Sequence, residues 1–473
     1  METITDEKLK NEHRMVRSGQ KASCTCGTWE CRTNEVVEAD ILKTLQKQYF
    51  VHLQDRRNLG TGRGRLKPQQ PEADIKDMDI NGHGTVKFSQ MEPQQFPFYE
   101  FFAGGGMARL GLGSDWRCTF SNDICEKKAS AYRAYFGDDE MQMGDVAKLK
   151  PKDLPGTPTL VWGSFPCQDL SLAGNGAGLG GERSGTFKPF WKLMRSMIGA
   201  GRVPQIIVLE NVIGTLTSHD GRDFATIISA LAQEGYRVGA LVMDAVRFLP
   251  HSRPRLFIVG VHEEVALPSQ LVLSDAAEPW HTKSLRFAFE RLPERLQDRW
   301  IWWNLPIPNE PVPAFASLIE EQPTGVEWHT KEQTDHIISL MSPLHLERLR
   351  KTQLLKTKIV GTLYRRIRPN EDGVKVQRAE IRFDQIAGCL RTPVGGSSRQ
   401  TIVVVEGPKV RSRLLSPRET ARLMGVPEDY PLPKSYNEAY HLFGDGLAVP
   451  VVRWLSNHLL TQIAAAIQVM IAA

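Results

Sequence analysis

The chain lacks both a long apolar run and a paired-cysteine framework. Its most apolar stretch, from Val451 onward, is broken by polar side chains such as Arg453 and His458, which favours a packed helix over a membrane span. The seven cysteines are odd in number and scattered over 473 residues, and no apolar leader precedes them. We therefore expect free thiols in a reducing compartment, a cytoplasmic location and no membrane partner.

A strong excess of charge of one sign is absent as well. The net charge is only +5, and 41% hydrophobic and 24% charged residues are ordinary for a folded globular protein. This balance is compatible with an anionic partner without requiring one. The sequence has no internal repeat, and its 473 residues leave room for more than one domain.

What the sequence does contain, from residue 96 onward, is an alternation of short apolar runs and helical stretches. The runs cover residues 96–102, 118–120, 159–162, 206–209 and 256–261, and the stretches between them include 126–136, 190–198 and 224–233. Strands alternating with helices predict an α/β fold with a parallel, doubly wound, Rossmann-like sheet.

The residues that follow four of these runs carry chemistry. A glycine triplet, residues 104–106, follows the first run, Asp123 the second, Cys167 the third and Glu210 the fourth. The carboxyl ends of parallel strands meet at one edge of a sheet, and ligands bind there. We therefore expect these groups to form one site.

The glycine triplet and Asp123 together indicate a nucleoside-bearing cofactor. Glycines let the backbone approach a ligand closely, and Asp123 falls where a ribose-binding acid belongs. The spaced dinucleotide fingerprint is missing, so we do not expect nicotinamide or flavin. For the glycines alone, a plain tight turn is the alternative.

Cys167 and Glu210 would supply a nucleophile and a proton donor. Cys167 lies between Pro166 and Gln168 and precedes the glycine-rich residues 174–185, which could form a lid; the alternative is a buried, inert thiol. Glu210 directly follows an apolar run, so we expect partial burial and a raised pKa rather than a plain surface acid.

In this order, the pieces resemble the DNA (cytosine-5)-methyltransferases of the prokaryotic or phage type. The resemblance covers residues 96–262 and 411–456 and rests on these segments: Phe102-Ala-Gly-Gly-Gly106, Asp123, Gly144-Asp145, Pro166-Cys167-Gln168, Glu210-Asn211-Val212, Arg253-Pro-Arg255, Arg418-Glu419 and Gly444-Asp445-Gly446. It implies that the Cys167 thiolate adds to C6 of a cytosine flipped out of duplex DNA, and that C5 then takes the methyl group of S-adenosyl-L-methionine.

The resemblance also implies roles for single residues. Glu210 would bind N3 and the exocyclic amine of the base, Arg255 and Arg253 would hold the base or tune the thiolate, and Gln168 and Asn211 complete the catalytic set. At the cofactor, Phe102 and Ile124 would flank the adenine, Asp123 would take the ribose hydroxyls and Asp145 the adenine amine. The full set of expected cofactor contacts is Phe102, Ala103, Gly104, Gly105, Gly106, Met107, Asp123, Ile124, Asp145, Val146, Pro166, Phe187, Asp445 and Gly446.

Four of the matching segments depart from the family pattern, and none of the departures touches the Cys167–Glu210 pair. Glu100 stands for the usual Asp, Met107 for a glycine and His251 for a Gln. The usual Gly-Asn-Ser is Gly444-Asp445-Gly446, so that a carboxylate, which only accepts hydrogen bonds, replaces an amide.

The predicted domain organisation has five parts. Residues 1–92 form an extension of unknown role with a linker and a possible helix at 36–53, 96–264 the first part of the catalytic and cofactor-binding domain, and 265–410 a smaller, irregular, β-rich target-recognition domain. Residues 411–434 join the domains through a helix that a Ser416–Glu419 capping box opens, and 435–473 return to the catalytic domain.

Double-stranded DNA is the expected substrate. We predict DNA contacts from a basic β-like segment around Arg365, Arg366, Arg368, Lys375, Arg378 and Arg382, and from Arg183, Arg391, Gly395, Gly396, Ser397, Ser398 and Arg399. A solvated basic face is the alternative for the segment. We expect a monomer on DNA, and a cognate restriction endonuclease acting on the same sites is a candidate partner.

The sequence leaves two other functions open and contains one cysteine cluster. An RNA cytosine methyltransferase and a catalytically silent DNA-binding homologue are the alternatives for the whole chain. Cys24, Cys26 and Cys31 offer three sulfurs, one ligand short of a zinc site unless His13 or His52 joins, so we assign no metal.

Overall fold

The computed structural model describes residues 15–18, 21–24, 30–32, 95–166, 186–370, 373–391 and 399–472. The chain divides into two units, Met1–Ser89 and Gln90–Ala473, and each is described by itself. In the first unit three short strands pair antiparallel in chain order: β1 (Met15–Ser18), β2 (Lys21–Cys24) and β3 (Glu30–Arg32). The helix predicted at residues 36–53, the linker and Cys26 lie outside the described residues.

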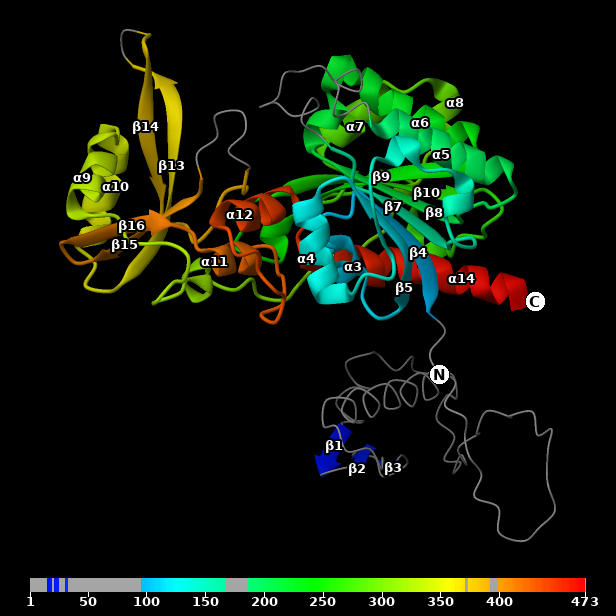
Figure 1. The fold of residues 1–473 in the computed structure, drawn as a ribbon, viewed down its shortest axis with the longest axis horizontal. Coiled ribbons are helices and arrows are strands. Elements are labelled where there is room, and N and C mark those ends of the chain that lie inside the picture. Colours follow the sequence, from blue (N-terminus) through cyan, green and yellow to red (C-terminus); the bar gives the residue numbers. More distant parts are fainter. Residues whose placement is uncertain are drawn as a thin grey trace, which may run out of the picture. The chain divides into compact units, whose positions relative to one another are not determined.

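A seven-stranded sheet organises the described part of the second unit (Figure 1). In spatial order its strands are β6 (Met141–Met143), β5 (Trp116–Asp123), β4 (Phe96–Phe101), β7 (Leu160–Gly163), β8 (Ile206–Asn211), β10 (Pro254–His262) and β9 (Tyr236–Asp244). The α/β prediction is confirmed, with the correction that β10, the fifth predicted strand, runs antiparallel to both neighbours. Only residues 245–253 connect β9 to β10, too few for the crossover that a parallel pair would need.

Helices cover both faces of this sheet (Figure 1). On one face α5 (Phe187–Gly199) and α6 (Arg222–Gln233) share a core with Ile207. On the other face α3 (Met107–Leu112) shares a core with Val208. Neighbouring strand residues thus face opposite layers, as the period of a strand requires. The helix predicted at residues 126–136 is α4 (Glu126–Phe136), which has the predicted bounds and contacts β6.

The C-terminal segment returns to the layer that contains α3. The predicted Ser416–Glu419 capping box opens α11, and the helices that follow are α11 (Pro417–Arg422), α12 (Tyr436–Asp445), α13 (Val449–Leu455) and, after a π-helical turn at Ser456–Leu460, α14 (Thr461–Ala472). α13 contacts α3, and Trp116 Nε1 of β5 donates to Ser456 Oγ at 3.1 Å. Among the described helices, none has both the length and the apolar character that a membrane span requires.

A four-stranded antiparallel sheet forms the β-rich region. Its order is β14 (Lys375–Arg382), β13 (Ile359–Pro369), β15 (Thr401–Glu406) and β16 (Lys409–Leu414). Helices α9 (Lys331–Ser339) and α10 (Pro343–Gln353) cover the face that carries Leu363 and Val403. Ile402 and Val404, on the other face, join the core that contains α3. The β13–β14 hairpin extends as a ribbon past the rest of this sheet (Figure 1).

The sequence predicts that the second domain begins at residue 265, but the residues from there to Trp303 pack on the large sheet. The elements β11 (Val272–Leu273), α7 (Lys283–Glu290), α8 (Glu294–Gln297) and β12 (Trp302–Trp303) belong with the large sheet, where β12 and α7 contact β9 and α8 contacts α6. The backbone of Val238 in β9 bonds to Arg299 and Ile301. Gly239 permits this approach, because a Cβ there would lie 2.1 Å from the Ile301 carbonyl oxygen.

Candidate functional site

The strand ends expected to form a site do meet at one edge of the sheet. β4 pairs in parallel with β5 and β7, and β7 pairs in parallel with β8, with Phe101 opposite Gly163 and Gly163 opposite Leu209. The glycine loop, Asp123 and Glu210 therefore lie at neighbouring strand ends. The chain is described only to Pro166 after β7, so Cys167, Gln168, Arg183 and the predicted lid lie outside the described residues.

The three glycines of the loop serve different purposes. Gly104 and Gly106 have φ values of 56° and 76°, in the left-handed region that favours glycine. A Cβ on Gly105 would lie 2.7 Å from Tyr430 Oη, which donates to the Gly105 carbonyl at 2.9 Å, and a Cβ on Gly106 would lie 2.4 Å from the Phe136 ring. Packing thus requires Gly105 and Gly106, whereas Gly104 keeps space above it.

Asp123 holds the glycine loop in place at the end of β5. Its Oδ2 accepts from Gly104 N at 2.8 Å and its Oδ1 accepts from Cys125 N at 2.7 Å. A carboxylate has about four acceptor positions, so two backbone bonds leave capacity for the ribose hydroxyls. The next residue, Ile124, is 70% exposed, so its aliphatic side chain lies open to solvent beside the acid.

The other expected cofactor contacts line the same end of the sheet. Asp145 accepts from Ala147 N and begins the short turn that buries Val146. The Phe102 ring lies 5.9 Å from the Phe190 ring of α5, with a left-handed backbone φ of 57° at Phe102. Phe187 is buried and packs on Phe165, so it supports the site from behind.

Glu210 is buried at the end of β8, as the sequence predicted. Only 8% of it is exposed, and its Oε1 lies 3.2 Å from Nε of Arg255. Burial raises the pKa of Glu210, and the nearby charges of Arg255 and Arg253 oppose this rise only in part. Asn211 donates from Nδ2 to the Phe165 carbonyl at 3.2 Å, which fixes the chain one residue before Pro166.

Arg253 differs from its expected role of holding the base. It is 2% exposed, and its two Nη atoms are taken by the carbonyls of Leu390, Gly444 and Gly446 and by the Cys389 thiol, at 2.6 to 3.2 Å. With its Nη donors engaged in this way, Arg253 ties β10 to the β-rich region and to the end of α12.

His251 stands where the family pattern has a Gln, and its contacts explain how an imidazole can replace the amide. Burial lowers the pKa of His251 to about 3, so the ring is neutral and offers one donor and one acceptor, as an amide does. Its Nδ1 lies 3.0 Å from the Leu423 carbonyl, and its Nε2 accepts from Leu390 N at 3.2 Å. The side chain therefore joins α11 to the segment that Arg253 also binds.

The departures from the family pattern at Met107 and Gly446 compensate each other in packing. A Cβ on Gly446 would lie 2.2 Å from the sulfur of Met107. The methionine that replaces a family glycine thus fills the space that the missing serine side chain leaves at residue 446. Both substitutions sit between the glycine loop and the end of α12.

Buried Glu100 is expected to make the stability of the fold depend on pH. Burial raises its pKa from 4.5 to about 8, while Arg109 and backbone N–H groups oppose the rise. A carboxyl with a raised folded-state pKa stabilises the fold fully below its unfolded pKa and loses this contribution as the pH rises toward the folded pKa. Relative to Glu100→Gln, the wild-type melting temperature should fall between about pH 5 and pH 8. Parallel melting profiles for the two proteins would contradict this assignment.

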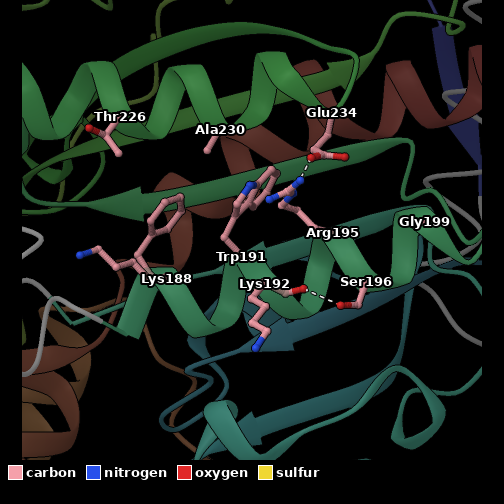
Figure 2. A pocket seen from close by; sticks show the side chains of 10 residues that line it. Lys188, Trp191, Lys192, Arg195, Ser196, Gly199, Thr226, Ala230 and Glu234 are labelled. Carbon is pink, nitrogen blue, oxygen red and sulfur yellow. Dashed lines mark hydrogen bonds and ion pairs between the residues drawn. The ribbon is translucent and has the colours of Figure 1, made fainter.

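A groove lies in the outer helix layer of the large sheet (Figure 2). It has a volume of about 600 Å³ and runs between α5 and α6, along Trp191, Lys192 and Ala230. Arg195 reaches across it to Glu234, with 2.7 Å between Nε and Oε1. Of the expected site residues only Phe187 lines this groove, so we assign it no part in the chemistry.

The predicted DNA contacts are only partly described. Residues 395–398 lie outside the described part of the chain. Arg391 is exposed, whereas Arg399 donates to Asn437 of α12 at 2.5 Å. On the ribbon, Glu380 pairs with Arg366 and Arg368 at 3.4 and 2.7 Å, which partly neutralises the basic face.

Within the described residues no cluster of His, Cys, Asp and Glu could hold a metal ion.

Sequence reasoning missed two groups at the site. Tyr430 was missed because its contact with Gly105 spans 325 residues. Lys128 was missed because no motif contains it.

The family model described as C-5 cytosine-specific DNA methylase matches residues 96–461. The type II methyltransferase M.BsuFI of Bacillus subtilis is 29% identical over 358 residues, which cover 75% of this chain and 70% of that protein. M.DsaV of Dactylococcopsis salina is 29% identical, covering 79% of this chain and 88% of the relative. M.HpaII of Haemophilus parainfluenzae is 26% identical, covering 82% and 98%.

Proposed function

The chain belongs to the C-5 cytosine-specific DNA methylase family, and on this premise we propose that it is a site-specific enzyme that methylates C5 of cytosine in duplex DNA. The observation that supports this most is the buried Glu210, which pairs with Arg255. Glu210 lies in β8, and the neighbouring strand β7 precedes Cys167 in the sequence. A nucleophile and a proton donor at adjacent strand ends suit a base that must be activated before it can accept a methyl group.

The chemistry follows from the weakness of cytosine C5 as a nucleophile. In the proposed reaction the Cys167 thiolate forms a bond to C6, and the C5–C6 π electrons move to C5. Glu210 holds a proton at N3 and accepts from the exocyclic amine, so that the charge arriving on the ring is neutralised. The electron pair at C5 then takes the methyl group of S-adenosyl-L-methionine, and S-adenosylhomocysteine leaves. A water molecule takes the proton from C5, the C5–C6 double bond re-forms and the thiolate leaves C6.

Arg255 orients Glu210 in this scheme. Its guanidinium lies beside the carboxylate, and the register of β10 against β8 fixes the distance between them. Burial holds the pKa of Glu210 above its ordinary value, although the charges of Arg255 and Arg253 oppose this rise. That balance suits a group that must both hold and share a proton.

S-adenosyl-L-methionine would supply the methyl group as a sulfonium electrophile. The residues present fit it: Asp123 can take the ribose hydroxyls, Ile124 offers an exposed apolar surface, and Gly104 leaves space above the loop. The remaining polar and backbone groups proposed to line it are Asp145 and the loop from Phe102 to Gly106.

Asp123→Ala should weaken cofactor binding more than DNA binding. We expect a loss of about tenfold to a hundredfold in affinity for S-adenosylhomocysteine, because hydrogen bonds to a charged group each contribute about 1.5–3 kcal/mol. Affinity for duplex DNA should change little. Titration calorimetry and a DNA mobility assay on the same preparations measure both, and equal losses would count against a ribose role.

For DNA contact we propose the ribbon of β13 and β14 together with the stretch of sequence around residues 391–399. The ribbon carries Arg365, Arg366, Arg378 and Lys375, and two-stranded ribbons fit the major groove. Glu380 restrains two of the arginines and so limits how they present themselves to a phosphate or a base. We further propose that the protein acts as a monomer on DNA in the bacterial cytoplasm, and that a restriction endonuclease shares its sites.

The test is a methylation reaction with unmethylated plasmid and S-adenosyl-L-methionine, read by bisulfite sequencing. We expect protected cytosines within one recurring short sequence. Parallel reactions with transfer RNA address the RNA alternative, and methylation of RNA alone would overturn the proposed substrate. Cofactor binding without transfer to either acceptor would favour a silent DNA-binding homologue.

A further inference from the structure

An ion pair that no motif predicted lies beside the glycine loop. Lys128 of α4 donates to Asp445, the last residue of α12, with 2.7 Å between Nζ and Oδ2. The stem of Lys128 passes Gly104, since a Cβ on that glycine would lie 4.0 Å from Lys128 Cδ. Only 24% of the Lys128 side chain is exposed, so the pair is set into the surface at the loop.

The charges of this pair are unusual for their place in the fold. A carboxylate at a helix C-terminus is disfavoured by the helix dipole, and Asp445 ends α12. Burial opposes the charge on Lys128, yet Asp445 and Asp123 together hold the pKa of Lys128 above its ordinary value. The structure therefore presents one fixed positive and one fixed negative charge next to Gly104.

The order of the strands indicates which part of the cofactor meets this pair. Asp145 follows β6, Asp123 follows β5, the glycine loop follows β4, and Cys167 follows β7. With the adenine and the ribose at Asp145 and Asp123, the sulfur and its amino-acid arm come to the glycine loop. That arm is a zwitterion, with an α-ammonium and an α-carboxylate group.

We propose that Lys128 and Asp445 together bind the amino-acid end of S-adenosyl-L-methionine, with Asp445 facing the α-ammonium and Lys128 the α-carboxylate. The inference rests on the proposed function; it adds Lys128 to the expected cofactor contacts and states which group of the cofactor Asp445 would face. It also accounts for the carboxylate at residue 445. Without Lys128 that carboxylate would repel the carboxylate of the ligand, whereas with Lys128 the two fixed charges complement the zwitterion.

Two ligands that differ in this arm test the proposal. S-adenosylhomocysteine and 5′-methylthioadenosine share the nucleoside and the thioether sulfur, but only the first carries the amino acid. In titration calorimetry with the full-length protein, Lys128→Met should weaken binding of S-adenosylhomocysteine about tenfold or more, because a charge-assisted hydrogen bond is lost. Its affinity for 5′-methylthioadenosine should stay unchanged.

The chain supplies a matched control in the neighbouring residue. Lys127 pairs with Glu438 at 2.7 Å, again between α4 and α12, but its side chain is 69% exposed. Lys127→Met should leave the affinities for both ligands unchanged. Adding Asp445→Asn to Lys128→Met should recover part of the S-adenosylhomocysteine affinity, since the uncompensated carboxylate is then removed.

Three results would overturn the inference. A pair that only links the two helices would make Lys127→Met and Lys128→Met act alike on both ligands. Equal loss of both ligands in Lys128→Met, or full retention of S-adenosylhomocysteine binding, would also reject the assignment. If the wild-type protein binds neither ligand, the proposed function fails as well, which separates that failure from one confined to the ion pair.

Discussion

Cys167→Ala is expected to reduce methyl transfer below detection while leaving affinity for duplex DNA nearly intact. Without the thiolate, nothing adds to C6, and C5 stays too weak a nucleophile to take a methyl group. The substitution removes one sulfur atom and leaves unchanged the β13–β14 ribbon and residues 391–399, which are proposed to bind DNA. Transfer of a radioactive methyl group to plasmid and a DNA mobility assay measure the two properties separately.

A second thiol near the site makes the control for this prediction informative. Cys389 lies 3.2 Å from Nη1 of Arg253. Although burial opposes it, the charges of Arg253, Arg255 and Arg391 lower the pKa of the Cys389 thiol. Cys389→Ala should retain most of the transfer activity. If Cys389→Ala is inactive and Cys167→Ala is active, the nucleophile has been assigned to the wrong cysteine.

Glu210→Gln is expected to slow methyl transfer by about 10²- to 10⁴-fold, the usual contribution of a positioned acid or base. The amide keeps the size of the side chain but cannot hold a proton for N3, and Arg255 loses the carboxylate that it faces. Because burial raises the pKa of Glu210, the wild-type rate should also decline as the pH rises through that pKa. This decline should be missing from the residual activity of the variant.

Glu263→Gln serves as the matched control for Glu210. Glu263 follows β10 and pairs with Arg299 at 2.9 Å, but the two side chains are 51% and 42% exposed. An exposed ion pair of this kind contributes little, so transfer should stay near the wild-type rate. A Glu210→Gln variant with a near-normal rate and an unchanged pH profile would remove Glu210 from the mechanism.

The strand-end positions could be predicted from sequence because they depend on local patterns. A short apolar run followed by a polar residue fixes both the strand and the point where its side chains reach the sheet edge, as for Asp123 and Glu210. The capping box at Ser416 and Glu419 is likewise a pattern four residues long. The burial of Glu210 followed from its place directly after β8.

The remaining features depend on contacts between distant parts of the chain. Lys128 and Asp445 are separated by 317 residues, and Arg253 and Gly446 by 193, so no local pattern pairs them. Residues 299–301 join the edge of the large sheet only because Gly239 leaves room for them. The antiparallel direction of β10 could not be predicted without β9, the strand that precedes it. Arg237 and Gly239 interrupt the apolar pattern of β9, so the sequence did not indicate a strand there.

The central claim is a covalent bond between Cys167 and cytosine, and a trapping reaction tests it most directly. A DNA duplex synthesised with 5-fluorocytosine in place of cytosine offers every site without knowledge of the recognised sequence. Fluorine at C5 cannot leave as a proton does, so the adduct should persist after methyl transfer. We predict a complex of wild-type protein and DNA that survives denaturing electrophoresis, requires S-adenosyl-L-methionine and is absent with Cys167→Ala. A complex that forms equally well with Cys167→Ala would contradict the mechanism.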